Sequence, residues 1–160
     1  MKKCLLLVFL AFTGTYQIKS QDLPFQKEVK YIDSVLSKNP YFEKFLGITY
    51  YYSLDITSEK EIIIKMDFRG PFSTTYTAKL ADLVHPFTAD TSEYSSSICW
   101  RCNTDETGKE RRCILQENVY TTGEKEQVIT DDICLMLPAE TALRIDLIGR
   151  IDKLLKEVLQ

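Results

Sequence analysis

The stretch AETALRIDLIGRIDKLLKEVL, residues 139–159, has the most regular hydrophobic pattern in the 160 residues of the chain. On a helix drawn through this stretch, apolar residues fall on one side and charged residues on the other. The apolar stripe consists of Leu143, Leu147, Ile148, Ile151, Leu154, Leu155 and Val158. Basic residues gather toward the later turns, where the negative end of the helix dipole favours them. We therefore expect a long amphipathic helix that buries its stripe against a sheet.

The middle of the chain has the period of β-strands. The stretches 50–56 and 62–68 alternate between two faces and flank a short polar turn, so they predict a hairpin. Further alternating stretches lie at 74–80, 95–103, 110–120 and 128–137, the last interrupted at Asp131-Asp132. The two that flank Gly108 predict a second hairpin.

A shorter helix is predicted at 26–37, where Val29, Ile32 and Leu36 fall on one stripe. Pro40 ends it, because the residue before a proline disfavours helical geometry. Together these elements predict an α+β fold that is mainly β. We expect a curled antiparallel sheet of about seven strands, with an N-terminal helix and a long C-terminal amphipathic helix that caps the sheet.

Residues 1–20 have the layout of a secretory signal peptide. Lys2 and Lys3 precede an apolar run from Cys4 to Phe12, and a polar stretch to Ser20 follows. The run is shorter than the roughly 20 residues that a membrane-spanning helix needs. We therefore expect removal of residues 1–20, a single domain at 21–160, no membrane span, and a location in the periplasm or outside the cell.

The charge balance disfavours one class of partner. The chain has a net charge of −3, and the three basic residues of the expected signal leave −6 for the remainder. A net acidic surface is atypical of proteins that bind nucleic acid or anionic membranes. We expect no nucleic-acid partner.

Several stretches, taken in order, resemble a family of small secreted domains of Bacteroidota with a pleckstrin-homology-like fold. They are Val29–Leu36, Tyr51–Asp55, Tyr76–Leu83, Cys102, Cys113-Ile114 and Ile151–Leu154. Related domains follow caspase-like peptidases. The resemblance implies a curled seven-stranded sheet capped by the C-terminal helix. It implies no catalytic residue, and we expect no enzymatic activity.

Four cysteines, Cys99, Cys102, Cys113 and Cys134, follow the expected signal, and an even number in an exported protein favours disulfides. Cys102 and Cys113 lie on opposite arms of the expected second hairpin, so they are the preferred pair. Cys99 with Cys113 is the rival pair, if the turn slips. The Cys99-Trp100-Arg101-Cys102 spacing also suits a redox site, but a reactive pair normally opens a helix. Zinc held by four thiolates is an alternative that normally shows two such motifs, and we expect no metal or cofactor.

Three consecutive tyrosines open the first hairpin. Because neighbouring strand residues face opposite ways, Tyr51 must point away from Tyr50 and Tyr52. With Tyr76 or Phe72 it is a candidate for an exposed aromatic patch.

These features predict an exported, non-catalytic binding or structural domain whose partner is another protein. One alternative is a lipocalin-like carrier of a small apolar ligand, which needs a cavity of roughly 300 Å³ or more. The others are an immunity-type inhibitor and a secreted thiol-redox protein.

Overall fold

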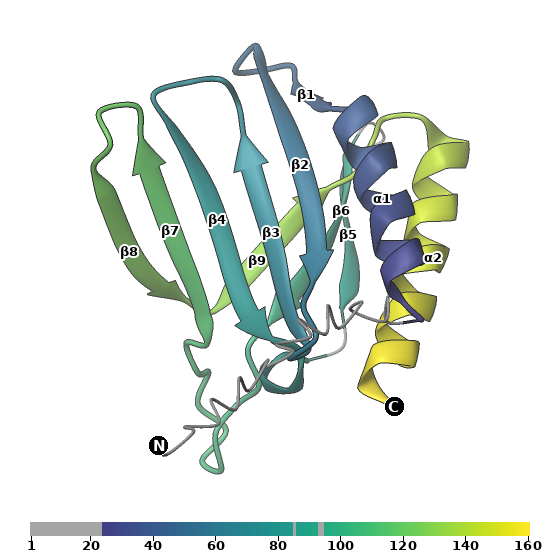
Figure 1. Ribbon diagram of the computed structural model, residues 1–160, viewed down its shortest axis with the longest axis vertical. Helices are drawn as coiled ribbons and strands as arrows, with labels where there is room; N and C mark the ends of the chain where they lie inside the picture. Colours follow the sequence, from purple (N-terminus) through teal and green to yellow (C-terminus); the bar gives the residue numbers. More distant parts are fainter. Residues whose placement is uncertain (1–23, 85, 93–94) are drawn as a thin grey trace, which may run out of the picture.

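The computed structural model describes residues 24–84, 86–92 and 95–160 (Figure 1). The expected signal peptide, residues 1–20, lies outside these described residues. The predicted class is confirmed: the fold is α+β, strands predominate, the sheets are antiparallel, and the helices precede and follow them. The elements are α1 (Gln26–Lys38), β1 (Tyr41–Glu43), β2 (Ile48–Ile56), β3 (Glu61–Asp67), β4 (Phe72–Lys79), the 3₁₀ turn η1 (Leu80–Asp82), β5 (Phe87–Ser92), β6 (Ser95–Arg101), β7 (Ile114–Tyr120), β8 (Lys125–Thr130), β9 (Asp132–Met136) and α2 (Thr141–Leu159).

The strands divide between two sheets. Six strands form the main sheet, in the order β1-β2-β3-β4-β7-β8, and three form a second sheet, in the order β5-β6-β9. The first predicted hairpin is confirmed as β2 and β3, with Tyr52 opposite Met66 and Leu54 opposite Ile64. The main sheet is open, with β1 and β8 at the two ends of its strand order (Figure 1).

The second predicted hairpin is wrong. The strands on either side of Gly108, β6 and β7, belong to different sheets: β6 pairs with β5 and β9, and β7 pairs with β4 and β8. The segment 103–112 closes only locally, through a single bridge between Thr104 and Glu110. Alternation correctly identified both strands, but it cannot specify which neighbour a strand pairs with.

The predicted interruption at Asp131-Asp132 marks a corner between the two sheets. β8 ends at Thr130 in the main sheet, and β9 begins at Asp132 in the second sheet. The Cys102 backbone N–H donates to the Asp131 carbonyl at 2.8 Å, and the Cys113 N–H donates to the Thr130 carbonyl at 3.2 Å. The ends of β6 and β7 therefore both bind this corner.

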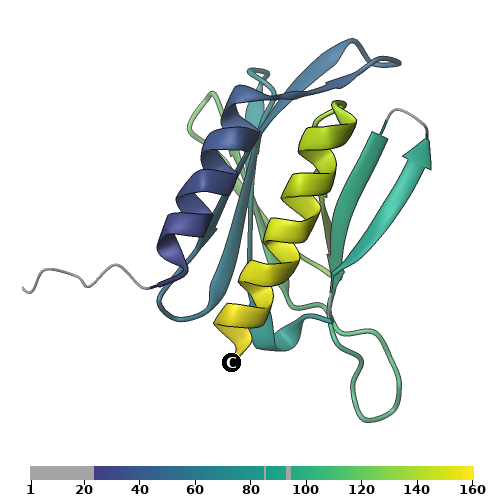
Figure 2. The ribbon, with the colours of Figure 1, turned by 90° about the vertical axis from the view of Figure 1, so that its right-hand side faces the viewer.

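The hydrophobic core lies between the two sheets and the two helices. Leu147 and Leu154 of the predicted stripe have no exposed surface, and Trp100 of β6 is 1 % exposed. α2 lies beside α1 and faces the second sheet (Figure 2). The face of the main sheet that carries Leu54 and Ile64 is buried, and we call it the inner face. The opposite face is the outer face.

One arginine joins the two helices. Arg150 of α2 contacts Glu28 of α1 at 2.7 Å and Asp146 of its own helix at 2.9 Å. Its guanidinium also lies 4.1 Å from the centre of the Tyr31 ring on α1. These contacts hold α1 against α2.

Candidate functional site

The turn between β1 and β2 exposes a group of large apolar side chains. Phe45 is 99 % exposed, Leu46 is 65 % exposed, and Phe42 of β1 is 53 % exposed. We call these three side chains the apolar tip. The turn that carries them lies at the top of the molecule in Figure 1. Isolated apolar residues are common on protein surfaces, but a group on one projecting turn is typical of a contact site.

Hydrogen bonds within the turn determine its shape. The Glu43 carboxylate accepts the Phe45 backbone N–H at 3.1 Å and the Tyr41 hydroxyl at 2.9 Å. The Gly47 N–H donates to the Glu43 carbonyl at 2.9 Å, and Gly47 adopts φ +66°, a conformation that favours glycine. The turn therefore presents Phe45 and Leu46 outward without needing to fold on binding.

A row of aromatic rings anchors the base of this turn. Four of the rings lie on neighbouring strands of the main sheet and one, Phe68, directly follows β3; in order across the sheet they are Tyr41, Tyr50, Phe68, Phe72 and Tyr120. Successive ring centres are 6.4, 5.9, 4.9 and 5.5 Å apart. Aromatic pairs at such spacings add stability beyond the area they bury. The row thus connects the tip to β7 across the sheet.

A polar network lies next to this row on the inner face. The Thr74 hydroxyl donates to Asn118 Oδ1 at 2.9 Å, and Gln116 Nε2 donates to the same oxygen at 3.2 Å. Thr74 is 1 % exposed and Asn118 is 8 % exposed. The Tyr120 hydroxyl donates to Glu126 at 3.0 Å. Buried polar groups that are satisfied in this way favour one arrangement of the strands.

The structure does not bring the three predicted surface aromatics together. Phe72 and Tyr76 lie on the inner face, where both are half-buried. Tyr51 pairs with Asp67 on the outer face, where the Arg69 guanidinium lies 4.5 Å from its ring centre. In the observed register, Tyr51 faces the opposite side of the sheet from Tyr50 and Tyr52, as the sequence predicts.

Burial changes the acidity of two inner-face tyrosines. Burial, followed by the nearby charge of Asp132, raises the pKa of Tyr76 above its usual value. Burial also raises the pKa of Tyr52, whose hydroxyl donates weakly to the Met66 sulfur at 3.5 Å. Both side chains are therefore neutral hydrogen-bonding groups at neutral pH.

The four described cysteines form two disulfides. Cys102 pairs with Cys113, and Cys99 pairs with Cys134. The rival pair, Cys99 with Cys113, does not form, because Cys99 lies directly opposite Cys134 in the β6–β9 register. Cys99 and Cys102 are 3 % and 5 % exposed and belong to separate bridges, so their spacing does not create a dithiol redox pair.

The Cys102–Cys113 bridge closes a projecting loop, residues 103–112. Within it, Asp105 accepts hydrogen bonds from the backbone N–H groups of Thr107 at 2.8 Å and Lys109 at 3.0 Å. The Thr107 hydroxyl, together with these N–H groups, lowers the pKa of Asp105. The loop therefore has an ordered turn at its tip.

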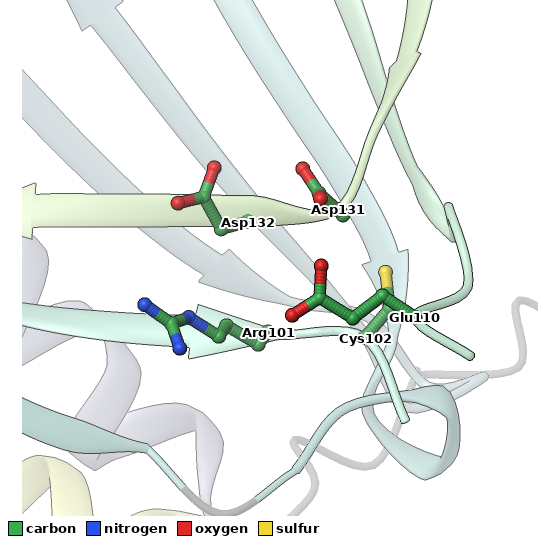
Figure 3. A pocket seen from close by; sticks show the side chains of 5 residues that line it. All are labelled: Arg101, Cys102, Glu110, Asp131 and Asp132. Carbon is green, nitrogen blue, oxygen red and sulfur yellow. The ribbon is translucent and has the colours of Figure 1, made fainter. Parts of the chain in front are cut away.

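A small polar cavity of about 170 Å³ lies where this loop meets the sheet corner. Asp131 and Asp132 line it from the corner, and Arg101 and Glu110 line it from β6 and the loop (Figure 3). Three carboxylates and one guanidinium suit water or a small polar group rather than an apolar ligand. The Cys102 side chain forms part of the wall.

A larger groove of about 400 Å³ opens between α1 and the outer face of β2 and β3. Its lining includes the buried residues Val29 and Leu54 and four charged residues: Lys30, Asp33, Asp55 and Lys65. Asp33 accepts the Leu54 backbone N–H at 3.1 Å. The groove is thus partly a contact by which α1 covers β2.

Within residues 24–84, 86–92 and 95–160, no three His, Cys, Asp or Glu side chains are placed to hold a metal ion. Neither helix in this part of the chain combines the length and hydrophobicity that a membrane span needs.

Comparison with protein-family models, curated proteins and solved structures finds no match to this chain. The resemblance to pleckstrin-homology-like domains therefore stays a prediction.

Sequence reasoning missed the apolar tip. The segment 41–49 has neither a helical nor a clear alternating pattern, so it predicted no element. The available signal was the order Phe45-Leu46-Gly47, in which two large apolar residues directly precede a glycine suited to a turn. Apolar residues beside a turn glycine are exposed more often than those within a strand.

Proposed function

We propose that this chain is an exported, non-catalytic binding domain whose partner is another protein. The observation that carries the proposal is the apolar tip, in which Phe45 and Leu46 are 99 % and 65 % exposed on a turn held by Glu43. Transfer of such side chains from water into a pocket contributes about 1.5–3 kcal/mol each. Because the turn is already ordered, little of that gain is lost on binding.

The chemistry of the tip favours a protein over a lipid surface. Membrane-surface elements typically combine apolar side chains with several basic ones. The turn that carries the tip has one lysine, Lys44, next to Glu43 in the sequence. The whole chain has a net charge of −3. Large apolar and aromatic side chains at the centre of protein interfaces often supply most of the binding energy.

The disulfides support the export part of the proposal. Two bridges are compatible with an exported protein, because disulfides persist in oxidising compartments. Removal of residues 1–20 on export is part of the same proposal. An immunity-type inhibitor would be one form of it, with a toxin as the protein partner.

Two alternatives receive less support. A thiol-redox protein needs a reactive dithiol, whereas Cys99 and Cys102 belong to different bridges. A lipocalin-like carrier encloses its ligand in a closed sheet, whereas the main sheet here is open, with β1 and β8 at its ends.

Variants of the tip test the proposal. The partner is first captured through a cross-linker at the tip in producing cells, and its affinity for the purified protein is then measured by calorimetry. We expect Phe45→Ser to weaken binding about 30-fold or more and Leu46→Ser about tenfold. Ile145→Ser is the matched control, since Ile145 on α2 is also 65 % exposed, and it should leave the affinity within about twofold.

Equal affinities for all three variants would overturn the proposal. So would Phe45-dependent binding to protein-free lipid vesicles, which would assign the tip to a membrane instead. Circular dichroism of each variant establishes that the fold is retained.

A further inference from the structure

The two edges of the main sheet differ in what covers them. β1 pairs only with the first three residues of β2, and α1 covers the same edge of β2 further along the strand. Asp33 Oδ1 accepts the Leu54 backbone N–H at 3.1 Å, and Gln26 Nε2 donates to the Ile56 carbonyl at 2.7 Å. Side chains of a helix thus occupy backbone groups that another strand would otherwise bind. Covering an edge in this way prevents unwanted pairing.

Among the described residues, none covers the opposite edge strand, β8, in this way. β8 is last in the strand order and lies at the left of the sheet in Figure 1. Lys125 to Ile129 are all exposed, and two of them are apolar: Val128 is 43 % exposed and Ile129 is 46 % exposed. Its register with β7 is regular over six pairs, without a bulge. Proline and bulges are common protective devices of free edges, and β8 has neither.

The direction of the free backbone groups follows from one hydrogen bond. The Tyr120 N–H donates to the Glu124 carbonyl at 2.9 Å, so Glu124 faces β7. Since backbone groups of an antiparallel strand alternate in direction, Glu126 and Val128 also face β7. The N–H and C=O groups of Lys125, Gln127 and Ile129 therefore point away from the sheet, available to another strand.

We propose that β8 pairs antiparallel with β8 of a second copy of this chain, about a two-fold axis at Val128. In this register Val128 lies opposite Val128 of the second copy, and Gln127 lies opposite Ile129. Glu126 comes opposite Thr130, a carboxylate beside a hydroxyl. Lys125 lies near Asp131, the corner residue that directly follows β8 and has the opposite charge. The two main sheets would form one continuous sheet.

Neighbouring registers are less favourable. An axis at Gln127 places the Glu126 carboxylate opposite Val128, and an axis at Glu126 places two like charges together, which destabilises a strand pair. An axis at Ile129 would put Glu126 and Lys125 opposite Asp132 and Ile133, which belong to β9 in the second sheet, so the paired segment becomes shorter. The strand is therefore self-complementary in one register, and that property selects a second copy as the occupant.

Cysteine cross-linking tests the register. Residues opposite each other in a non-hydrogen-bonded pair have Cα atoms about 4.5 Å apart, within the range that a disulfide spans. On mild oxidation we expect Val128→Cys to form a covalent dimer, at least tenfold faster than the matched variants Gln127→Cys and Glu126→Cys. The four described native cysteines are already paired. Equal rates for the three variants would overturn the proposal.

A proline substitution tests the edge itself. The Gln127 N–H points away from β7, so Gln127→Pro removes a donor from the free edge and leaves the ladder with β7 intact. In analytical ultracentrifugation we expect the wild type and Gln127→Ala to dimerise, with an affinity about 30-fold higher than that of Gln127→Pro.

Three results would contradict the pairing of β8. They are a wild type that remains monomeric at millimolar concentration, a Gln127→Pro variant that dimerises as well as Gln127→Ala, and a dimer that Phe45→Ser abolishes. The last result would place self-association at the apolar tip. Loss of partner binding by tip variants, with dimerisation unchanged, would leave the two proposals independent of each other.

Discussion

The Cα atoms of Cys102 and Cys113 lie 5.7 Å apart, and the bond between these residues joins the end of β6 to the start of β7. The two strands belong to different sheets. Both residues also donate their backbone N–H to the corner between β8 and β9, at Asp131 and Thr130. One covalent bond and two hydrogen bonds therefore hold the two sheets together at this point.

Removing either disulfide should destabilise the fold, and by different amounts. Closing a loop restricts the unfolded chain, and the restriction grows with loop length. The Cys102–Cys113 bridge spans 11 residues and the Cys99–Cys134 bridge spans 35. We expect a loss of about 3 kcal/mol for the double Cys102→Ser, Cys113→Ser variant and about 4 kcal/mol for Cys99→Ser, Cys134→Ser.

Urea denaturation measures both losses. Peptide mapping of the unreduced wild type is the control, since it must first recover the two bridges seen here. Two results would contradict this assignment. One is a wild type in which Cys99 is joined to Cys113, and the other is a variant that lacks one of the bridges and is still as stable as the wild type.

The pattern of side chains predicted where the helices and strands lie, but not which strands pair with each other. The stripe that contains Leu147, Leu154 and Val158 predicted α2 because a helix with one apolar side must bury it. The break at Asp131 predicted the end of β8, but not that β9 joins another sheet. The strand partners of β6 and β7 depend on contacts between distant segments, and alternation carries no information about them.

The candidate sites show the same limit. Cys102 and Cys113 were the preferred pair because they were expected on one hairpin. The structure pairs them although that hairpin is absent, because the ends of β6 and β7 meet at the corner. The exposure of Phe45 depends on the length of β1 and on the hydrogen bonds of Glu43, neither of which a residue pattern reveals.

The buried pair Thr74 and Asn118 should contribute to stability as a unit. Thr74→Val removes the hydroxyl that donates to Asn118 at 2.9 Å, which should cost about 1 kcal/mol. Asn118→Leu leaves that buried hydroxyl without its acceptor and should cost about 1–3 kcal/mol. In a double-mutant cycle followed by thermal unfolding, the combined variant should lose less than the sum of the two single variants. Strict additivity would show that the two side chains do not interact.

Stability should fall in alkali because of the inner-face tyrosines. Burial raises the pKa of Tyr52 and Tyr76 in the folded state, whereas tyrosine in the unfolded chain has a pKa of about 10. The folded protein therefore keeps these protons to higher pH than the unfolded chain does. The stability that they contribute is complete below about pH 10 and is lost as the pH rises above that value.

The free energy of unfolding at about pH 8 and about pH 11 checks this expectation. Tyr52→Phe cannot ionise, so it should lose less stability between the two pH values than the wild type does. Tyr51→Phe, which removes the hydroxyl of a half-buried tyrosine on the outer face, is the control variant. An identical pH dependence for Tyr52→Phe and the wild type would exclude Tyr52 as a source of the alkaline loss.

Site-specific photo-cross-linking in the producing cells tests the central claim, that the apolar tip contacts a protein. A photoreactive benzophenone amino acid replaces Phe45 in one variant and Ile145 in the other, two exposed apolar positions on different elements. We expect one discrete protein adduct from position 45, of constant mass across preparations, and none of that mass from position 145. The same adducts from both positions, or none from position 45, would contradict it.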